Sequence, residues 1–204
     1  DAVVIERLLN EGATIVGTLN QDEFGRGGTG ETSSFGYTRN PRDPNYSPGG
    51  SSSGSGAAVA AGEVDIALGL DARGSGLIPA AWCGVVCIRG THGLVPTFGV
   101  VYLDNTFDYV TPIARTVEEV ALALEVIAGE DPRDGQWVRG PIKVDRYTES
   151  LTNSVKGVRI GLLKEAFEWK SSEEDANRLV KEAIHKLESN GTLIKEVSLP
   201  LFKA

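Results

Sequence analysis

The chain has 204 residues, with 41% hydrophobic and 24% charged side chains and a formal net charge of −8. These values are typical of a globular protein that can bury a core. The acidic balance and the lack of a basic run argue against nucleic acid or an anionic membrane surface as a partner. No apolar stretch approaches the roughly 20 residues that a membrane-spanning helix needs.

The cysteines and the first residue bear on where and how the chain occurs. Cys83 and Cys87 are too few for a disulfide framework and indicate a reducing, cytoplasmic compartment. Their spacing of four residues fits one helix face. We expect both cysteines to be buried as small hydrophobic side chains rather than to bind a metal. Because the chain has no methionine and begins with Asp1, we expect a processed piece of a longer protein, with residues absent on at least one side.

The N-terminal part is predicted to hold a helix, a strand and a long loop. Residues 2–10 place apolar side chains near one helical face, and Gly12 is a typical stop. Ala13–Gly17 is predicted to be a buried strand. Residues 20–50 are rich in Gly, Asn, Pro and Ser, and a loop of this length suggests function rather than simple connection.

Short elements follow this loop. Ser53–Ala61 is predicted to be a helix whose N-terminus opens on a Gly-Gly-Ser loop, and Val64–Leu68 a short buried strand. Asp71–Ser75 is predicted to be the turn after that strand. Pro79 suits the first turn of a short helix, and Val85–Ile88 is a second apolar run.

A capping box marks the next helix. In Thr116–Glu119 (TVEE) the threonine oxygen can accept from the N–H of the last glutamate, whose carboxylate can reach back to the threonine N–H. This helix is predicted to run through Ile127 to a C-cap at Gly129.

A strand, a helix and a strand are predicted to end the chain. The strands are Val158–Leu163 and Thr192–Val197, and the amphipathic helix between them begins at Ser171 or Ser172 and ends near Gly191. Its inward apolar side chains are predicted to be Leu179, Val180, Ala183, Ile184 and Leu187. Alternating strands and helices favour an α/β fold, with a mixed β-sheet core covered by helices.

Two glycine-rich patterns lack the context that their usual functions need. Residues 25–30 match G-x-G-x-x-G without a strand before or a good helix after, so a turning loop is favoured over dinucleotide binding. Residues 50–54 match G-x-S-x-G without the strand that enters a nucleophile elbow. A Ser-His-Asp hydrolase would have to use His92 or His185 and stays a minor alternative.

The most informative stretch is residues 47–79, where two Gly/Ser loops flank an apolar insert that a flexible linker would lack. GGSSSGSGAAVAAGEVDIALGLDARGSGLIPAAWCGVV closely resembles the signature of the amidase signature family. The resemblance extends in consistent order over DAVVIERLLNEGATIVGTLNQDEFG, ETSSFGYTRNPRDPNYSPGGSS, THGLVPTFGVV, DYVTPIARTVEEVALALEVIAGEDPRD and VRIGLLKEAF. Within the family, the chain looks most like the amidases associated with nitrile metabolism.

The resemblance implies one amidase signature domain over residues 1–204, lacking the family's N-terminal lysine segment and its C-terminal part. It implies hydrolysis of a small-molecule carboxamide to a carboxylate and ammonia or an amine, with no cofactor and no metal. The family uses a nucleophilic serine, a bridging serine next to a cis peptide bond, and a lysine.

Matching within the signature places these roles on this sequence. The nucleophile falls on Ser75 and the bridging serine on Ser51, and the backbone N–H groups of Ala72, Arg73, Gly74 and Ser75 form the oxyanion hole. This agrees with residue chemistry, because a serine hydroxyl needs a base and glycine-rich turns let N–H groups converge on an oxyanion.

Asp71 and Ser52 are candidate substrate-side residues. Ser52 also competes for the nucleophile's role, together with Ser53 and Ser55, although capping of the following helix and solvation of the loop would equally explain these serines.

Several positions depart from the family pattern. The family lysine lies upstream of the segment resembling Asp1–Gly17, and none of the present lysines matches it. Arg73 replaces a glycine of the oxyanion turn, at a cost of about 1–2 kcal/mol if that position needs a positive φ. Further departures are Gly76 and Leu77 for the usual Ile-Arg pair, and Cys87, Arg89 and Gly90 for the usual Gly, Lys and Pro.

These departures keep two alternatives open. One is a non-catalytic or degenerate amidase-like module. The other is an amidotransferase subunit that acts on charged tRNA, for which the sequence offers no basic patch. The expected partner is a small-molecule amide, with no nucleic acid and no membrane, and a homo-oligomer remains an alternative to a monomer.

Overall fold

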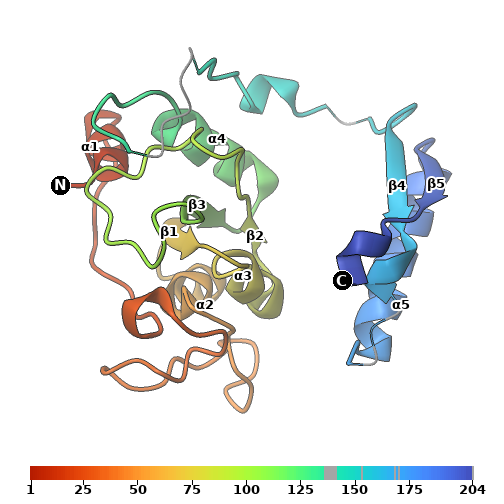
Figure 1. Cartoon of the computed structure of the whole chain (residues 1–204), viewed down its shortest axis with the longest axis horizontal. Helices are drawn as coiled ribbons and strands as arrows, with labels where there is room; N and C mark the ends of the chain where they lie inside the picture. The colour runs from red at the N-terminus through yellow and green to blue at the C-terminus, as the bar shows by residue number, and fades with distance from the viewer. Residues whose placement is uncertain (136–141, 153, 168, 170, 204) are drawn as a thin grey trace. The chain divides into compact units, whose positions relative to one another are not determined.

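The computed structural model describes residues 1–135, 142–152, 154–167, 169 and 171–203 (Figure 1). The chain divides into two compact units, Asp1–Ser150 and Leu151–Ala204, and each is considered by itself. Helices and strands occur in both units, so the predicted mixed α/β class is confirmed. The single domain over residues 1–204 stays a prediction.

A three-stranded antiparallel sheet organises the first unit. Its order is β1 (Ile66–Asp71), β3 (Tyr109–Ala114), β2 (Val86–Cys87), with β3 in the middle. The register of β1 on β3 runs from Ile66 opposite Ala114 to Asp71 opposite Tyr109. The sequence predicts no element over the residues of β3. Pro112 lies at the centre of β3, where proline is rare.

Four helices pack around this sheet, namely α1 (Val3–Asn10), α2 (Ser53–Ala61), α3 (Leu77–Cys83) and α4 (Val117–Ile127). One apolar cluster lies between α1, α4 and the sheet and contains Val3, Val4, Val95, Val110, Leu124, Ile127 and Ala128. A second cluster lies between α2, α3 and the sheet and contains Val59, Ala67, Ala80 and Ile113. The sheet is therefore held between two apolar layers, with α2 and α3 on one side and α1 and α4 on the other.

The local helix signals are confirmed. Helix α2 has the predicted bounds, α1 begins one residue later than predicted, and Pro79 lies in the first turn of α3. Both halves of the capping box form at α4, with Thr116 Oγ1 accepting from the Glu119 N–H at 3.2 Å and a Glu119 carboxylate oxygen accepting from the Thr116 N–H at 3.0 Å. Helix α4 ends at Ile127, and its C-cap is Ala128 rather than the predicted Gly129.

The predicted strand at Ala13–Gly17 is wrong. These residues adopt no regular structure, and the side chains of Ile15 and Val16 are 48% and 74% exposed. A short apolar run does not by itself distinguish a strand from an irregular segment. Among the described residues, no strand pairs with residues 13–17. The predicted strand at Val64–Leu68 is shifted, because β1 begins at Ile66 and ends at Asp71.

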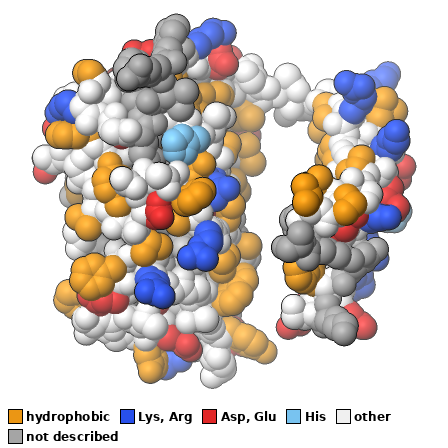
Figure 2. Space-filling model, in the orientation of Figure 1, with side chains coloured by type: hydrophobic (Ala, Val, Ile, Leu, Met, Phe, Trp, Pro, Cys, Tyr) orange, Lys and Arg blue, Asp and Glu red, His pale blue; other side chains and the backbone are white. Residues whose placement is uncertain are grey.

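The second unit contains a parallel β-α-β arrangement. Strands β4 (Arg159–Leu163) and β5 (Leu193–Val197) pair side by side, and α5 (Glu174–Ser189) connects them. The apolar side chains of α5 are less buried than predicted. Leu179, Val180 and Ala183 are exposed, and Ile184 and Leu187 are only half-buried. Hydrophobic side chains accordingly appear on the visible surface of this unit in Figure 2.

Short 3-10 turns complete the described structure, at Glu23–Gly25, Thr148–Ser150, Lys164–Phe167 and Pro200–Lys203. Within the described ranges, no helix combines the length and the apolar character that crossing a bilayer requires.

Candidate active site

Ser51 lies at the end of the first Gly/Ser loop, just before α2. The peptide bond that joins Gly50 to Ser51 is cis, the arrangement expected next to the bridging serine. The Ser51 side chain is 1% exposed, and its carbonyl oxygen accepts from the Asp22 N–H at 2.9 Å. Its Oγ is buried without a hydrogen-bond partner among the described residues, so this hydroxyl is available to a proton-transfer partner.

The long loop at residues 20–50 supports Ser51 through Asp22. The fully buried Asp22 carboxylate accepts from the N–H of Gly30 at 3.1 Å and from the N–H and hydroxyl of Thr32 at 3.0 and 2.9 Å. A β-carbon on Gly50 would lie 2.2 Å from Asp22 Oδ2 and 2.9 Å from the backbone nitrogen of Gly30, so a larger residue there would force the loop to move. Sequence reasoning expected this loop to be functional but did not single out Asp22.

Ser75 lies on the second loop, between β1 and α3. It is 9% exposed, and its carbonyl oxygen accepts from the Ser52 N–H at 3.0 Å. This backbone hydrogen bond joins the two Gly/Ser loops. The structure therefore brings the stretches carrying Ser51 and Ser75 together.

Asp71 organises the turn around Ser75. Its fully buried carboxylate accepts from the N–H groups of Gly74 at 2.7 Å, Gly76 at 2.8 Å and Leu77 at 3.1 Å. The Asp71 side chain is thus committed to contacts within the protein. An Asp directly before a glycine-rich turn is the sequence signal for such anchoring, because short carboxylates bind the backbone N–H groups that follow them.

The contacts of the Asp71 carboxylate show which of the four predicted oxyanion donors are already engaged. The Gly74 N–H is engaged by Asp71 Oδ1. For the N–H groups of Ala72, Arg73 and Ser75, no acceptor occurs in the part of the chain that the structure describes. Three of the four predicted donors therefore remain available to a ligand.

Arg73 does not carry the backbone penalty that a positive φ would impose. Among the described residues other than glycine, only Phe24 has a positive φ, and the left-handed position in this turn is Gly74, with φ 106°. The Arg73 side chain is exposed. Its charge contributes to lowering the pKa of Asp104, although the hydroxyl hydrogen bond from Thr106 is the larger cause.

Ser52 and Ser55 both hold the loop to β1. Ser52 Oγ accepts from the Leu70 N–H at 3.0 Å and donates to the Leu70 carbonyl at 3.2 Å. Ser55 Oγ donates to the Leu68 carbonyl at 2.7 Å. Both hydroxyls are therefore engaged by backbone groups of β1, beside which the two serines lie.

The two cysteines are poor candidates for a nucleophile. Burial raises the pKa of Cys83 to about 11 and that of Cys87 to about 12. Because the thiolate is the nucleophilic form, neither is suited to covalent catalysis at neutral pH. Both cysteines are free, and among the described residues no group of acidic, His and Cys side chains could hold a metal ion.

The two histidines are accounted for elsewhere. His92 lies edge-on to the Tyr109 ring, and its Nε2 lies 3.1 Å from the Thr106 carbonyl oxygen. His185 lies on α5 with its side chain 79% exposed. The described contacts of His92, which belongs to the same unit as the two serines, include neither Ser51 nor Ser75.

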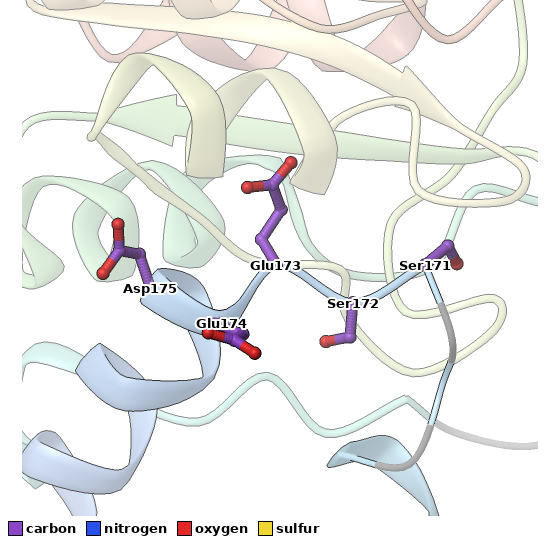
Figure 3. Close-up of a pocket in the computed structure, with 5 residues that line it drawn as sticks. All are labelled: Ser171, Ser172, Glu173, Glu174 and Asp175. Carbon is purple, nitrogen blue, oxygen red and sulfur yellow. The ribbon is translucent and has the colours of Figure 1, made fainter.

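A surface pocket in the second unit contains none of these serines. It lies at the start of α5 and is lined by Ser171, Ser172, Glu173, Glu174 and Asp175 (Figure 3). Ser172 Oγ donates to Asn177 Oδ1 at 2.9 Å. Helix α5 begins at Glu174, after an N-cap at Glu173, rather than at the predicted Ser171 or Ser172. These acidic side chains are explained by the helix start, where negative charge is stabilised.

The paired serine loops on a mixed α/β scaffold define the class of the protein. The Amidase family matches residues 1–204, and the chain belongs to this family.

Individual relatives sharpen the comparison. The chain is 48% identical over 200 residues to the A subunit of the glutamyl-tRNA(Gln) amidotransferase from Natronomonas pharaonis, covering 98% of this chain and 47% of the relative. The counterpart from Salinibacter ruber is 46% identical over 200 residues, covering 98% of this chain and 38% of the relative. The chain thus spans less than half the length of these relatives. The predicted resemblance to nitrile-metabolism amidases within the family stays a prediction.

Solved structures agree with the fold. The crystal structure of the corresponding amidotransferase protein from Thermotoga maritima superposes with a TM-score of 0.90 at 37% identity, covering 100% of this chain and 44% of that one. The native peptide amidase of Stenotrophomonas maltophilia superposes with a TM-score of 0.84 at 33% identity, covering 98% of this chain and 42% of that one.

Proposed function

We propose that the intact protein hydrolyses a carboxamide C–N bond, with Ser75 as nucleophile, Ser51 as bridging serine and a lysine outside residues 1–204 as base. Membership of the amidase family supports the reaction class. The observation that carries the assignment of residues is the Ser52–Ser75 backbone hydrogen bond of 3.0 Å, because it joins the two loops that bear the serines.

The proposed reaction begins with Ser75. Its Oγ attacks the amide carbon while its proton passes to Ser51 Oγ, which gives its own proton to the neutral lysine. The buried and unpartnered state of Ser51 Oγ suits this relay. The developing oxyanion accepts from the free N–H groups of Ala72, Arg73 and Ser75, and such donors usually supply the largest electrostatic contribution to catalysis.

Collapse of this intermediate breaks the C–N bond. The proton held by the lysine returns through Ser51 to the leaving nitrogen, which departs as ammonia or an amine and leaves an ester on Ser75. Water then attacks the ester carbon and gives a proton through Ser51 to the lysine. Collapse of this second intermediate breaks the ester C–O bond, and the lysine returns the proton through Ser51 to Ser75 Oγ. The products are a carboxylate, the amine and the free enzyme.

The proposal is tested in the intact protein with Ser75→Ala and Ser51→Ala. Ser189→Ala, at the end of α5, is the matched control. We expect the first two variants to lose ammonia release from a panel of simple amides by at least about a thousandfold, as loss of a nucleophile or proton relay does. A serine-directed fluorophosphonate should label the parent protein and the control, but not Ser75→Ala. Equal ammonia release by Ser75→Ala and the parent would contradict the proposal.

The names of the relatives favour a second candidate within the same chemistry. In an amidotransferase, the released ammonia would be passed to an activated glutamyl-tRNA rather than to solvent. The test is to measure glutamine hydrolysis and glutamyl-tRNA amidation by the intact protein purified with its bound subunits. Amidation that requires Ser75 would support this candidate, whereas hydrolysis of simple amides by the isolated protein favours a free-standing amidase.

If the protein is a non-catalytic or degenerate amidase-like module, the same assays should give a third result. The intact protein would fold but would neither turn over amides nor react with the fluorophosphonate. The absence of a positive φ at Arg73 removes one physical reason for this alternative.

A further inference from the structure

Arg89 contacts the turn that carries Ser75 at two points. Its Nη1 lies 3.2 Å from Asp71 Oδ1 and 3.5 Å from the carbonyl oxygen of Ala72. Its guanidinium carbon lies 4.7 Å from the centroid of the Tyr109 ring, and Tyr109 is the cross-strand partner of Asp71. Arg89 thus bridges the end of β1, the start of β3 and the turn.

The contact with the Ala72 carbonyl has a geometric consequence. The carbonyl of Ala72 and the N–H of Arg73 belong to one peptide unit, and this unit is trans, because the only cis bond among the described residues is Gly50–Ser51. In a planar trans peptide the C=O and N–H bonds point in opposite directions. Because the Ala72 carbonyl faces Arg89, the Arg73 N–H points away from Arg89.

The contact with Asp71 has an electrostatic consequence. Asp71 is fully buried, and its one ion pair among the described residues is with Arg89. Its carboxylate lies beside the N–H groups proposed to stabilise an oxyanion, and an unneutralised negative charge there would oppose a second one. The Arg89 side chain is 36% exposed, so solvent weakens this effect without removing it.

We propose that Arg89 is a positioning residue for the oxyanion hole: its guanidinium fixes the Ala72–Arg73 peptide and offsets the charge of Asp71. This inference rests on the proposed amide hydrolysis. Arg89 itself need not touch the substrate, because it acts through Asp71 and through the backbone of the turn.

The kinetic test compares Arg89→Ala, Arg89→Lys and Arg115→Ala in the intact protein. Arg115 is a matched control, because its side chain is 38% exposed and pairs with the carboxylate of Asp65 at 2.7 Å, away from the turn. Loss of one oxyanion donor costs about 10²–10³ in kcat. Since Arg89 acts indirectly, we expect Arg89→Ala to lower kcat roughly tenfold or more, with KM within about twofold of the parent.

Chemical rescue distinguishes positioning from a general loss of stability. Guanidinium ion at a low, non-denaturing concentration should recover part of the kcat of Arg89→Ala, and Arg89→Lys should retain part of it, because both restore a cation at Asp71. Arg115→Ala should match the parent. A kcat of Arg89→Ala equal to the parent, or a loss that follows the unfolded fraction and responds to neither rescue, would overturn the proposal.

A measurement that needs no turnover separates this inference from the proposed function. Amide hydrogen exchange of the segment 72–77 should be faster in Arg89→Ala than in the parent and unchanged in Arg115→Ala. Faster exchange in a protein that hydrolyses no amide would support the positioning role and contradict the proposed function. Unchanged exchange would contradict the positioning role whatever the activity.

Discussion

At the scale of single residues, the close approach of the Ser75 turn to β3 depends on Gly76. A β-carbon at this position would lie 2.3 Å from Thr111 Oγ1 and 3.2 Å from Thr111 Cβ. The first distance is shorter than any van der Waals contact, so the turn or the strand would have to move. Thr111 therefore explains why glycine suits position 76 of this chain.

This contact predicts the effect of Gly76→Ala. We expect the free energy of unfolding to fall by roughly 1–3 kcal/mol, the usual cost of overpacking. Ser75 should also react more slowly with the fluorophosphonate, because the turn that carries it is displaced. Gly28→Ala is the matched control, since a β-carbon at Gly28 would have no neighbour within 4 Å.

A double variant identifies the cause. Thr111→Ala removes the Oγ1 atom that the new β-carbon would meet, so Gly76→Ala combined with Thr111→Ala should cost less than the sum of the two single changes. Chemical denaturation of the four proteins measures this coupling. Strict additivity would show that the Gly76–Thr111 approach does not limit the residue at position 76.

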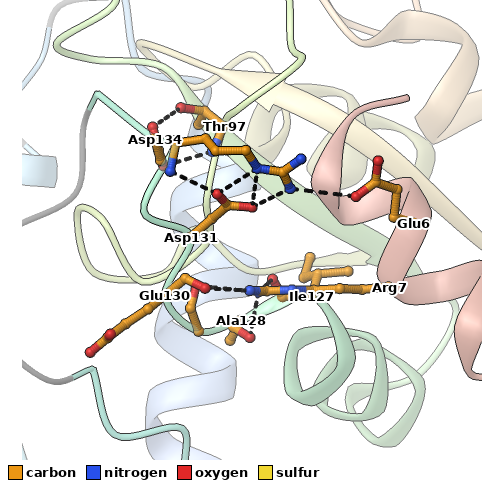
Figure 4. Close-up of polar contacts among 10 residues, drawn as sticks. Glu6, Arg7, Thr97, Ile127, Ala128, Glu130, Asp131 and Asp134 are labelled. Carbon is orange, nitrogen blue, oxygen red and sulfur yellow. Dashed lines mark hydrogen bonds and ion pairs between the residues drawn. The ribbon is translucent and has the colours of Figure 1, made fainter.

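At the scale of elements, the junction between α1 and the end of α4 is fixed by two arginines (Figure 4). Arg7 Nη1 donates to the carbonyl oxygens of Ile127 and Ala128, both at 2.7 Å, which satisfies acceptors that the helix end leaves open. Arg133, in the segment after α4, has its Nη2 2.6 Å from Asp131 Oδ2 and 3.5 Å from Glu6 Oε2 of α1. The segment after α4 is therefore tied to α1 by charged groups.

The Asp131–Arg133 pair predicts a pH dependence of stability. The hydrogen bond from Arg133 is the largest cause that lowers the pKa of Asp131, from 3.8 to about 2. A depressed carboxyl pKa stabilises the folded state above the unfolded pKa, and this contribution is lost as pH falls through the folded pKa. The stabilisation should thus be complete at neutral pH and decline between about pH 3.8 and 2.

Asp131→Asn tests this dependence. We expect a lower Tm than the parent at neutral pH, and a difference that narrows as pH falls through this window. Thermal unfolding monitored by circular dichroism across the acid range measures it, with Asp145→Asn, in an exposed ion pair with Lys143, as control. A Tm difference independent of pH would mean that the ionised Asp131 carboxylate contributes nothing.

Elements whose signals are local could be predicted, and those set by distant partners could not. Helices α2 and α4 were predicted because their termini and apolar patterns lie within a few residues. Strand β3, with Pro112 at its centre, had no clear local strand signal. Ala13–Gly17 was overpredicted because a strand also needs a partner. In the candidate site, Ser51 and Ser75 were identified through the resemblance to the amidase signature family. The roles of Asp22 and Arg89 depend on loops that meet only in the folded chain.

At the scale of the whole molecule, the negative charge of residues 1–204 makes this part of the protein a poor binding surface for RNA. The formal net charge is −8, and binding to a phosphate backbone depends on Lys and Arg that replace counterions. If the intact protein works within an amidotransferase, tRNA contacts should map outside residues 1–204. Cross-linking of the intact complex to glutamyl-tRNA, followed by peptide mapping, measures this. Cross-links concentrated within residues 1–204 would contradict the expectation.

The hydrogen bond between Ser52 and Ser75 is made by backbone atoms alone. Replacement of either serine by any residue other than proline leaves this donor and acceptor in place, so the two loops can stay joined when a side chain is lost. If Ser75 and Ser51 act as proposed, activity would be lost by replacing one side chain and regained by restoring it. A lineage of such proteins could pass between hydrolase and binding module without rebuilding its architecture.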